Sequence, residues 1–192
     1  MAESKLGLLF VMSGPSGVGK DSVLTAMFEK LSGVVRSISS TTRAPRTGEV
    51  DGKDYRFLTR EQFETGIAAG VFLEFAEYAG NLYGTPLAGV ANQRHAGNDV
   101  ILKIEVQGAH RVREAAPDAT LIFIEPPSLS VLESRLRLRA TDNEELIKAR
   151  LKRAAEELEC VSWYDFRIVN DDLSAAADAL RAIVIAERCR IR

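Results

Sequence analysis

The sequence predicts an α/β fold in which a parallel sheet is flanked by helices and a smaller mixed α+β lobe is inserted. Apolar runs typical of buried parallel strands occur toward both ends of the chain and alternate with helical patterns. A glycine-rich turn, residues 14–20, joins the first of these runs to a helix. Between about residues 39 and 97 the alternation gives way to short strand-like pieces. We therefore expect a core of residues 1–38 and 98–192 and an inserted lobe of residues 39–97.

In the first half of the chain, the elements follow from apolar spacing and from residues that start or stop helices. Leu6–Ser13 is a continuous apolar run, and the helical spacing after the glycine-rich turn stops at Gly33. Thr59, with Gln62 three residues later, is typical of a capping box, so a helix should run from there to about Ala69. The other predicted elements are strands at Val34–Ile38, Tyr55–Leu58, Val71–Tyr78 and Leu82-Tyr83, a turn at Gly80-Asn81, and a helix over Pro86–Ala96 with proline in its first turn.

In the second half, Val100–Val106 and Thr120–Ile124 repeat the buried-strand pattern. Ser128 is a typical helix N-cap, and Leu173–Arg188 is an alanine-rich segment with helical apolar spacing. Trp163 is expected to pack inside the protein. The other predicted elements are a helix ending at about Leu138, a longer helix over Asn143–Val161, and a short strand at Arg167–Val169.

Composition excludes several classes of protein. The 192 residues include 25 Lys+Arg and 27 Asp+Glu, and this near-neutral balance argues against a general nucleic-acid or anionic-membrane binder. With 46% hydrophobic and 27% charged residues the chain has the composition of a globular domain. The two cysteines, Cys160 and Cys189, lack the spacing of a disulfide framework or a zinc site. Since neither a signal peptide nor a membrane-spanning run is seen, we expect a cytoplasmic protein with no membrane or nucleic-acid partner.

Basic residues are nevertheless clustered in two segments, residues 36–60 and residues 135–153. Such clusters are either places where a strongly anionic ligand is held or solvated helix faces.

The glycine-rich turn matches the phosphate-binding pattern G-x-x-x-x-G-K directly after a strand and before a helix. Its backbone N–H groups and the helix N-terminus favour phosphate, and Lys20 would neutralise charge on the β- and γ-phosphates. Asp21 stands where Ser or Thr normally offers a hydroxyl to Mg²⁺, and Ser22 follows one place late, so no protein ligand is assigned to the metal. The predicted nucleoside-triphosphate residues are Gly14, Pro15, Ser16, Gly17, Val18, Gly19, Lys20, Asp21 and Ser22.

A second anion site is predicted by Arg43 and Arg46, which flank a proline. The proline stiffens the turn, so both guanidinium groups can point at one target, an arrangement suited to bidentate recognition of phosphate. Tyr55 and Tyr83 could each supply a further hydroxyl donor.

Over essentially the whole chain, these motifs resemble the guanylate kinase family. The most specific match is the block S-x-T-T-R-x-P-R-x-G-E-x-x-G-x-x-Y, which runs from Ser39 to Tyr55. The resemblance implies a P-loop kinase core, an inserted GMP-binding lobe and a lid at about residues 136–150. It also implies Mg²⁺-dependent transfer of the γ-phosphate of ATP to GMP, giving ADP and GDP. Other segments that carry the resemblance are Glu74, Asn81–Gly84, Gln107-Gly108 and Ile168–Asp172.

The resemblance further implies which residues hold GMP. A carboxylate at Glu74 would accept both N1–H and the exocyclic N2–H₂ of guanine, whereas adenine offers only an acceptor at N1 and would leave the carboxylate unpaired. The alternative for Glu74 is a surface carboxylate on a strand. Thr85 stands where serine is usual and keeps the hydroxyl. The implied GMP-binding residues are Ser39, Arg43, Arg46, Tyr55, Glu74, Tyr83 and Thr85.

In the lid, the resemblance implies arginines that stabilise charge on the transferring phosphoryl group. Arg153 does not match the family clearly and is a candidate for a solvated face. Glu105 is a candidate for ordering magnesium-bound water, Lys103 stands where many members carry an acid, and Asn170 matches a position near the adenine, in a turn. The implied catalytic residues are Lys20, Arg43, Arg135, Arg139 and Arg150.

Two other functions compete with this interpretation. Guanylate-kinase-like domains of membrane-associated scaffolds bind phosphopeptides and do no chemistry, but they sit in multidomain chains and usually have a degraded P-loop. A P-loop kinase for another monophosphate conflicts with the serine–arginine block and with Glu74. The expected small-molecule partners are ATP, GMP and dGMP, and the oligomeric state, monomer or dimer, stays open.

Overall fold

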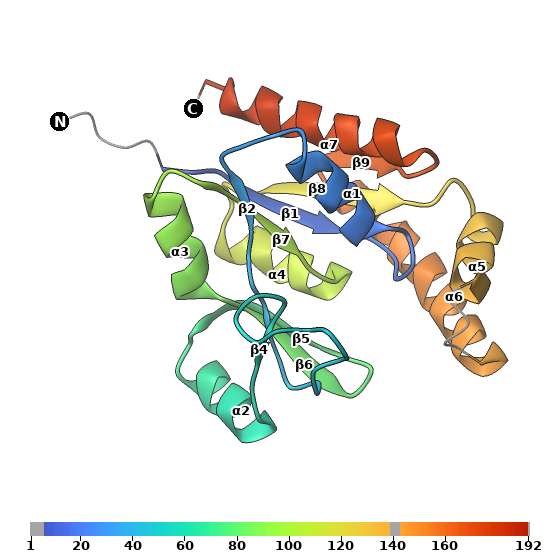
Figure 1. The fold of residues 1–192 in the computed structure, drawn as a ribbon, viewed down its shortest axis with the longest axis horizontal. Coiled ribbons are helices and arrows are strands. Elements are labelled where there is room, and N and C mark those ends of the chain that lie inside the picture. Colours follow the sequence, from blue (N-terminus) through green and yellow to red (C-terminus); the bar gives the residue numbers. More distant parts are fainter. Residues whose placement is uncertain (1–5, 139–142, 192) are drawn as a thin grey trace. The chain divides into compact units, whose positions relative to one another are not determined.

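The computed structural model describes residues 6–138 and 143–191. The chain forms two compact units, of which unit 1 comprises Met1–Val11 and Gly33–Ala119 and unit 2 comprises Met12–Ser32 and Thr120–Arg192. The helices and strands are labelled in Figure 1. In chain order they are β1 (Leu9–Ser13), α1 (Lys20–Phe28), β2 (Val34–Arg36), β3 (Ser40–Thr41), β4 (Arg56–Phe57), α2 (Arg60–Ala68), β5 (Phe72–Tyr78), β6 (Asn81–Pro86), α3 (Leu87–His95), β7 (Asp99–Lys103), α4 (Val106–Ala115), β8 (Thr120–Glu125), α5 (Leu129–Leu138), α6 (Glu144–Glu159), η1 (Cys160–Trp163), β9 (Phe166–Val169) and α7 (Leu173–Arg188).

The predicted sheet has the strand order β2-β7-β1-β8-β9, and β1 contributes residues to both units. In unit 1, β2 pairs with β7 in parallel, with Val34 opposite Asp99. In unit 2, β8 pairs with β9 in parallel, with Ile122 opposite Phe166. All residues of β1 are buried, as the continuous apolar run predicts. The α/β class with a parallel sheet is confirmed.

Unit 1 carries a second sheet, of order β4-β3-β6-β5. Its β5–β6 hairpin turns at Ala79 and Gly80, which have φ of 49° and 76°. The predicted Gly80-Asn81 turn is therefore wrong by one residue. Asn81 belongs to β6, and its side-chain amide donates to the Ala79 carbonyl at 3.1 Å, so it stabilises the turn from the adjoining strand.

The start of α2 agrees with the local sequence signal, whereas the start of α3 is shifted by strand pairing. The Thr59 capping box is confirmed, since the backbone N–H of Gln62 donates to Thr59 Oγ1 and the backbone N–H of Thr59 donates to Gln62 Oε1. Pro86 was expected inside the first turn of a helix but is the N-cap of α3 and the last residue of β6. It pairs with Phe72 in the hairpin, and extended backbone geometry is compatible with the proline ring.

The helix α4 is missing from the sequence prediction, which extended a strand to Val106. The strand β7 ends at Lys103, and Val106 is the first helical residue. The buried positions of α4 include Val106, Ala109 and Val112, a helical spacing. Polar residues between them and a glycine, at position 108, concealed this pattern.

In unit 2, Figure 1 shows α7 lying alongside α1, and α5 lying beside α6. Buried Leu132 and Leu136 of α5 pack with Ala154 of α6. Trp163 is 51% exposed, so the expectation that it packs inside is wrong. It lies in the short helix η1 after α6, where the chain turns toward β9. No helix among residues 6–138 and 143–191 combines the length and apolarity needed to cross a bilayer.

Candidate active site

In unit 2, the glycine-rich turn between β1 and α1 has a backbone that requires glycine. Gly14, Gly17 and Gly19 have φ of 140°, 91° and 98°, a region that other residues rarely adopt. A Cβ on Gly14 would lie 2.0 Å from the carbonyl oxygen of Ile124, so the loop also passes too close to β8 for any side chain. The turn therefore has the bare, curved backbone that a phosphate-binding loop needs.

Lys20 opens α1 and curls back over this loop. Its ammonium group donates hydrogen bonds to the carbonyl oxygens of Gly14 and of Pro15, the latter at 3.2 Å. The positive charge therefore already lies beside the loop whose amides would bind phosphate. Asp21 and Ser22 follow as exposed residues in the first turn of α1, and the acid there interacts favourably with the helix dipole.

Asn170 braces the same loop. Its side-chain amide donates to the Val18 carbonyl at 2.7 Å. Its backbone N–H donates at 2.8 Å to the backbone carbonyl of Glu125, the last residue of β8. A Cβ on Gly19 would lie 2.5 Å from the Asn170 amide nitrogen, which makes this a close fit. The resemblance implies a position near the adenine, in a turn, and the structure adds that Asn170 supports the phosphate loop.

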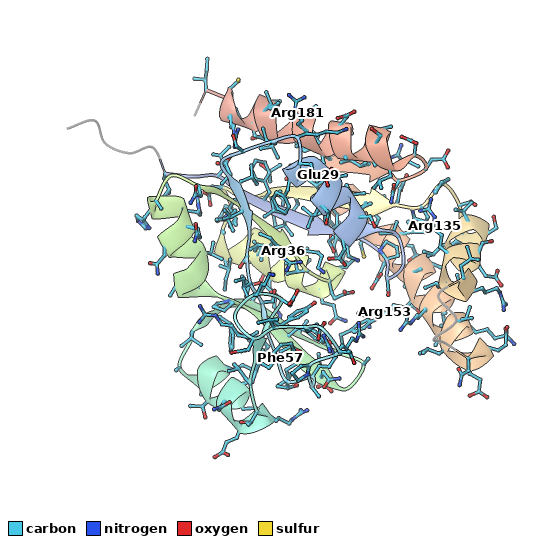
Figure 2. The ribbon with its side chains drawn as sticks, in the orientation of Figure 1. Glu29, Arg36, Phe57, Arg135, Arg153 and Arg181 are labelled. Atoms are coloured by element: carbon cyan, nitrogen blue, oxygen red, sulfur yellow. The ribbon has the colours of Figure 1, made fainter. Side chains whose placement is uncertain are left out.

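Two of the three predicted lid arginines, Arg135 and Arg150, lie on α5 and α6. Arg135 of α5 approaches the phosphate loop, with 3.5 Å between its Nη1 and the Val18 carbonyl, and Figure 2 shows it on that helix. Arg150 is half-buried on α6, and Arg139 lies outside the described residues. Arg153, also on α6, forms an ion pair with Glu157 at 2.8 Å.

In unit 1, the predicted phosphate-binding residues are brought together. Arg43 lies with its guanidinium carbon 5.5 Å from the centre of the Tyr55 ring, and the rings of Tyr55 and Tyr83 meet edge-on at 6.1 Å. Figure 2 labels Phe57, whose ring centre lies 6.0 Å from that of Tyr55. Arg46 is exposed in the adjoining loop.

Glu49 binds the Arg43 side chain and the Arg46 backbone, a role that was not expected from the sequence. Its carboxylate accepts two bonds from Arg43 Nη2, at 2.7 and 2.9 Å, and one from the Arg46 backbone N–H at 2.7 Å. The bond from Arg43 lowers the pKa of Glu49, and the bond to Glu49 raises the pKa of Arg43. The signal was present in the serine–arginine block, where Glu49 is one of the fixed positions.

Glu74 is a buried carboxylate, so the surface alternative is wrong. Its side chain lies on β5 with the residue 5% exposed, and the Thr85 hydroxyl donates to its Oε1 at 2.6 Å. Burial raises the pKa of Glu74 to about 7, while the Thr85 bond and the Arg111 charge act in the opposite direction. Ser39 directly precedes Ser40, which pairs with Gly84, so the register carries Ser39 toward Thr85.

The acidic groups of the described residues do not form a preformed metal cage. Within the described residues, no group of three or more His, Cys, Asp or Glu side chains is placed to hold a metal ion. Glu105, the N-cap of α4, has a buried Oε2 for which no hydrogen-bond partner is found among the described residues. A single carboxylate of this kind suits a water-mediated contact better than a complete metal site.

Comparisons with known proteins find the same family by sequence and by structure. The family model described as guanylate kinase matches residues 7–187. A guanylate kinase of Desulfitobacterium hafniense is 48% identical over 190 residues, which cover 99% of this chain and 95% of the relative. One from Streptococcus thermophilus is 52% identical over 189 residues, covering 98% and 90%. The crystal structure of guanylate kinase from Anaplasma phagocytophilum superposes with a TM-score of 0.80 at 34% identity, covering 97% of this chain and 89% of that one.

Proposed function

The chain belongs to the guanylate kinase family, and we propose that the two groups of residues described above carry out ATP-dependent phosphorylation of GMP. The reaction is ATP + GMP ⇌ ADP + GDP. An oxygen of the GMP phosphate forms a bond to the γ-phosphorus of ATP, and the bond from that phosphorus to the ADP oxygen breaks. Since the attacking phosphate is already ionised, no general base is needed, and the protein supplies position and charge.

ATP is proposed to bind unit 2. The loop amides and the N-terminus of α1 would hold its phosphates, while Lys20 would exchange its bonds to the Gly14 and Pro15 carbonyls for bonds to phosphate oxygens. Arg135, Arg139 and Arg150 are proposed to neutralise charge on the transferring group, with residues of about 136–150 acting as a lid that excludes water.

Mg²⁺ is proposed to accompany ATP, where it would neutralise phosphate charge. The described side chains supply too few acidic ligands for a protein cage, so the ion would be held chiefly by phosphate oxygens and water. Glu105 remains the candidate for ordering one such water, because its buried Oε2 needs a donor.

GMP is proposed to bind unit 1, within the lobe of residues 39–97. Arg43, Arg46, Tyr55 and Tyr83 would bind its phosphate, which would replace Glu49 as the partner of the Arg43 guanidinium. A doubly ionised phosphate carries more negative charge than one carboxylate and has more acceptor oxygens. Its charge-assisted hydrogen bonds to the Arg43 guanidinium therefore favour the exchange.

Guanine is proposed to bind the ionised Glu74 carboxylate, with Thr85 and Ser39 alongside. The single observation that best supports GMP over other nucleotides is this buried carboxylate, fixed by the 2.6 Å bond from Thr85. N1–H and N2–H₂ of guanine together provide the donors that such a carboxylate needs. Adenine has only an acceptor at N1 and would leave this buried carboxylate without the donors that guanine supplies.

The test is a screen of nucleoside monophosphates with ATP and Mg²⁺. We expect kcat/KM for GMP to exceed that for AMP by at least about a hundredfold, with dGMP accepted more weakly. Comparable values for AMP and GMP would refute the assignment of guanine to Glu74. We propose that the enzyme serves guanine nucleotide synthesis and GMP recycling in the cytoplasm.

A further inference from the structure

Gly108 occupies the third position of α4, where nothing in the backbone requires glycine. Its φ is not among the positive values that occur in this chain, so an alanine would fit the local conformation. Glycine inside a helix is less favourable than alanine. A reason for glycine must therefore come from what lies next to it.

What lies next to Gly108 is the carboxylate of Glu74. A Cβ built on Gly108 would lie 2.4 Å from Glu74 Oε2 and 3.1 Å from Glu74 Cδ. The next nearest atom, Cδ1 of Ile104, is 3.4 Å away, an ordinary contact. The space that glycine leaves is thus filled by one oxygen of one side chain.

The other oxygen of that carboxylate is fixed from the opposite direction. Thr85 pairs with Glu74 across the β5–β6 hairpin, and its hydroxyl donates to Oε1 at 2.6 Å. The carboxylate is therefore held between the Thr85 hydroxyl of the sheet and the bare first turn of α4. Thr85 alone leaves the group free to rotate about the Oε1 contact, whereas both neighbours together define one orientation.

We propose that Gly108 determines the specificity for guanine, by leaving the room in which Glu74 presents both carboxylate oxygens to the base. This inference rests on the proposed role of Glu74 and extends it to α4. A methyl group at residue 108 strikes the far end of a flexible side chain rather than backbone. The carboxylate, not the helix, is what moves, so folding is retained while the base loses its acceptors.

The test compares two glycine-to-alanine substitutions in helices of unit 1. Gly108→Ala should lower kcat/KM for GMP by at least about tenfold, because a displaced carboxylate no longer accepts both donors. The KM for ATP should stay within about twofold. Gly89→Ala in α3 is the matched control, since the nearest atom to its added Cβ would be Pro86 Cβ at 4.0 Å. It should leave both parameters unchanged.

Inosine monophosphate supplies a readout that a merely structural defect would not move. It keeps N1–H but lacks the 2-amino group, so it makes one of the two contacts with Glu74. Gly108→Ala should therefore reduce the preference for GMP over inosine monophosphate as well as the rate. An unchanged preference, or equal losses for ATP and GMP, would overturn the proposal.

A double variant separates this proposal from the role of Glu74 itself. In a Glu74→Ala background the clash is gone, so adding Gly108→Ala should change kcat/KM for GMP by less than about twofold. If Gly108→Ala fails to fold, the double variant should fold, since its cavity accepts the methyl group. Full additivity, or a double variant that also fails to fold, would overturn the inference. If Gly108→Ala has wild-type kinetics and Glu74→Ala is impaired, the inference about Gly108 is overturned while the role of Glu74 stands. If Glu74→Ala itself has wild-type kinetics, the proposed role of Glu74 is refuted.

Discussion

Thr85 and Glu74 face each other across the β5–β6 hairpin, and the Thr85 hydroxyl donates a 2.6 Å hydrogen bond to Glu74 Oε1. The pair is enclosed, with Thr85 0% and Glu74 5% exposed. Burial alone would favour the neutral acid, and the hydroxyl bond partly restores the carboxylate. The pKa of the Glu74 carboxyl, about 7, is therefore close to neutral pH.

The first prediction concerns the pH dependence of GMP binding. The pKa of Glu74 is raised to about 7 by burial, so the acid form is populated in the unliganded protein as the pH falls below that value. Only the carboxylate accepts both guanine donors, so GMP affinity should fall by up to about tenfold for each pH unit below 7. Calorimetric titration with GMP between pH 5.5 and 8, without ATP, measures this.

Because the GMP phosphate also titrates in this range, the control is Glu74→Gln. This variant keeps the phosphate contribution and should lose the additional dependence on pH. If the wild type and Glu74→Gln have parallel pH profiles, the proton in question does not belong to Glu74.

The second prediction concerns the Thr85 hydroxyl, which donates to Glu74. Thr85→Val keeps the shape but leaves Oε1 without its donor, and a hydrogen bond to a charged group contributes about 1.5–3 kcal/mol. We expect kcat/KM for GMP to fall about ten- to hundredfold in steady-state assays, with the KM for ATP unchanged. Thr85→Ser retains the hydroxyl and should stay within about threefold of wild type. A loss in Thr85→Ser together with wild-type kinetics in Thr85→Val would mean that the methyl group, not the hydroxyl, matters.

The third prediction concerns the arginine that Glu49 holds. Arg43→Ala should cost roughly 2–4 kcal/mol in kcat/KM for GMP, because a charge-assisted contact with the phosphate is lost. Arg60→Ala is the control: Arg60 lies on α2 in unit 1 and pairs with Glu64 at 2.9 Å on the exposed surface. It should change kcat/KM for GMP by less than about twofold. A loss in Arg43→Ala that falls mainly on ATP would show that its site has been misassigned.

The fourth prediction concerns the support of the phosphate loop. Asn170→Ala removes the 2.7 Å bond to the Val18 carbonyl and leaves that acceptor with the longer 3.5 Å contact from Arg135, at a cost of about 0.5–1.5 kcal/mol in the free energy of unfolding. The KM for ATP should rise, while calorimetric affinity for GMP alone should not change. Asn98→Ala, which loses a 2.8 Å bond to Gln93 in unit 1, is the control and should leave the KM for ATP unaltered. Unchanged ATP kinetics in Asn170→Ala would limit Asn170 to a structural turn.

The elements that could be predicted are those whose signals are local. The continuous apolar run of β1, the Thr59 capping box and the spacing of α7 depend on neighbouring residues only, and all three are found. The start of α3 could not be predicted from Pro86, because its strand pairing with Phe72 involves a partner distant in sequence. The helix α4 was missed for a related reason, since Gly108 has a low helix propensity and is explained by its contact with Glu74, which is distant in sequence.

The same distinction applies to the site. The phosphate loop and the serine–arginine block are contiguous motifs, and the structure brings Arg43, Tyr55 and Tyr83 together as predicted. Glu49 and Gly108 were visible as motif positions, but what they do depends on which atoms they meet. No pattern in the sequence states that Gly108 faces Glu74, because the two residues belong to different elements.

The last prediction concerns Asp21, the residue that departs from the common P-loop pattern. Its carboxylate would stand near a triphosphate that is already strongly negative, which is unfavourable unless Mg²⁺ lies between them. The exposed first turn of α1 gives it a different role, since an acid there contributes about 0.3–1 kcal/mol through the helix dipole. We therefore expect Asp21→Ser to leave kcat within about tenfold and Asp21→Ala to do little more harm.

A magnesium titration of both variants at saturating ATP and GMP distinguishes these roles. If Asp21 acts only through the helix, the Mg²⁺ concentration for half-maximal rate should be the same in wild type, Asp21→Ser and Asp21→Ala. A large rise in that concentration for Asp21→Ala, reversed in Asp21→Ser, would show that an oxygen ligand is needed at this position. The serine variant is decisive because its hydroxyl restores a ligand without restoring the charge. The metal explanation therefore predicts a different Mg²⁺ requirement for the two variants, whereas the dipole explanation predicts the same one.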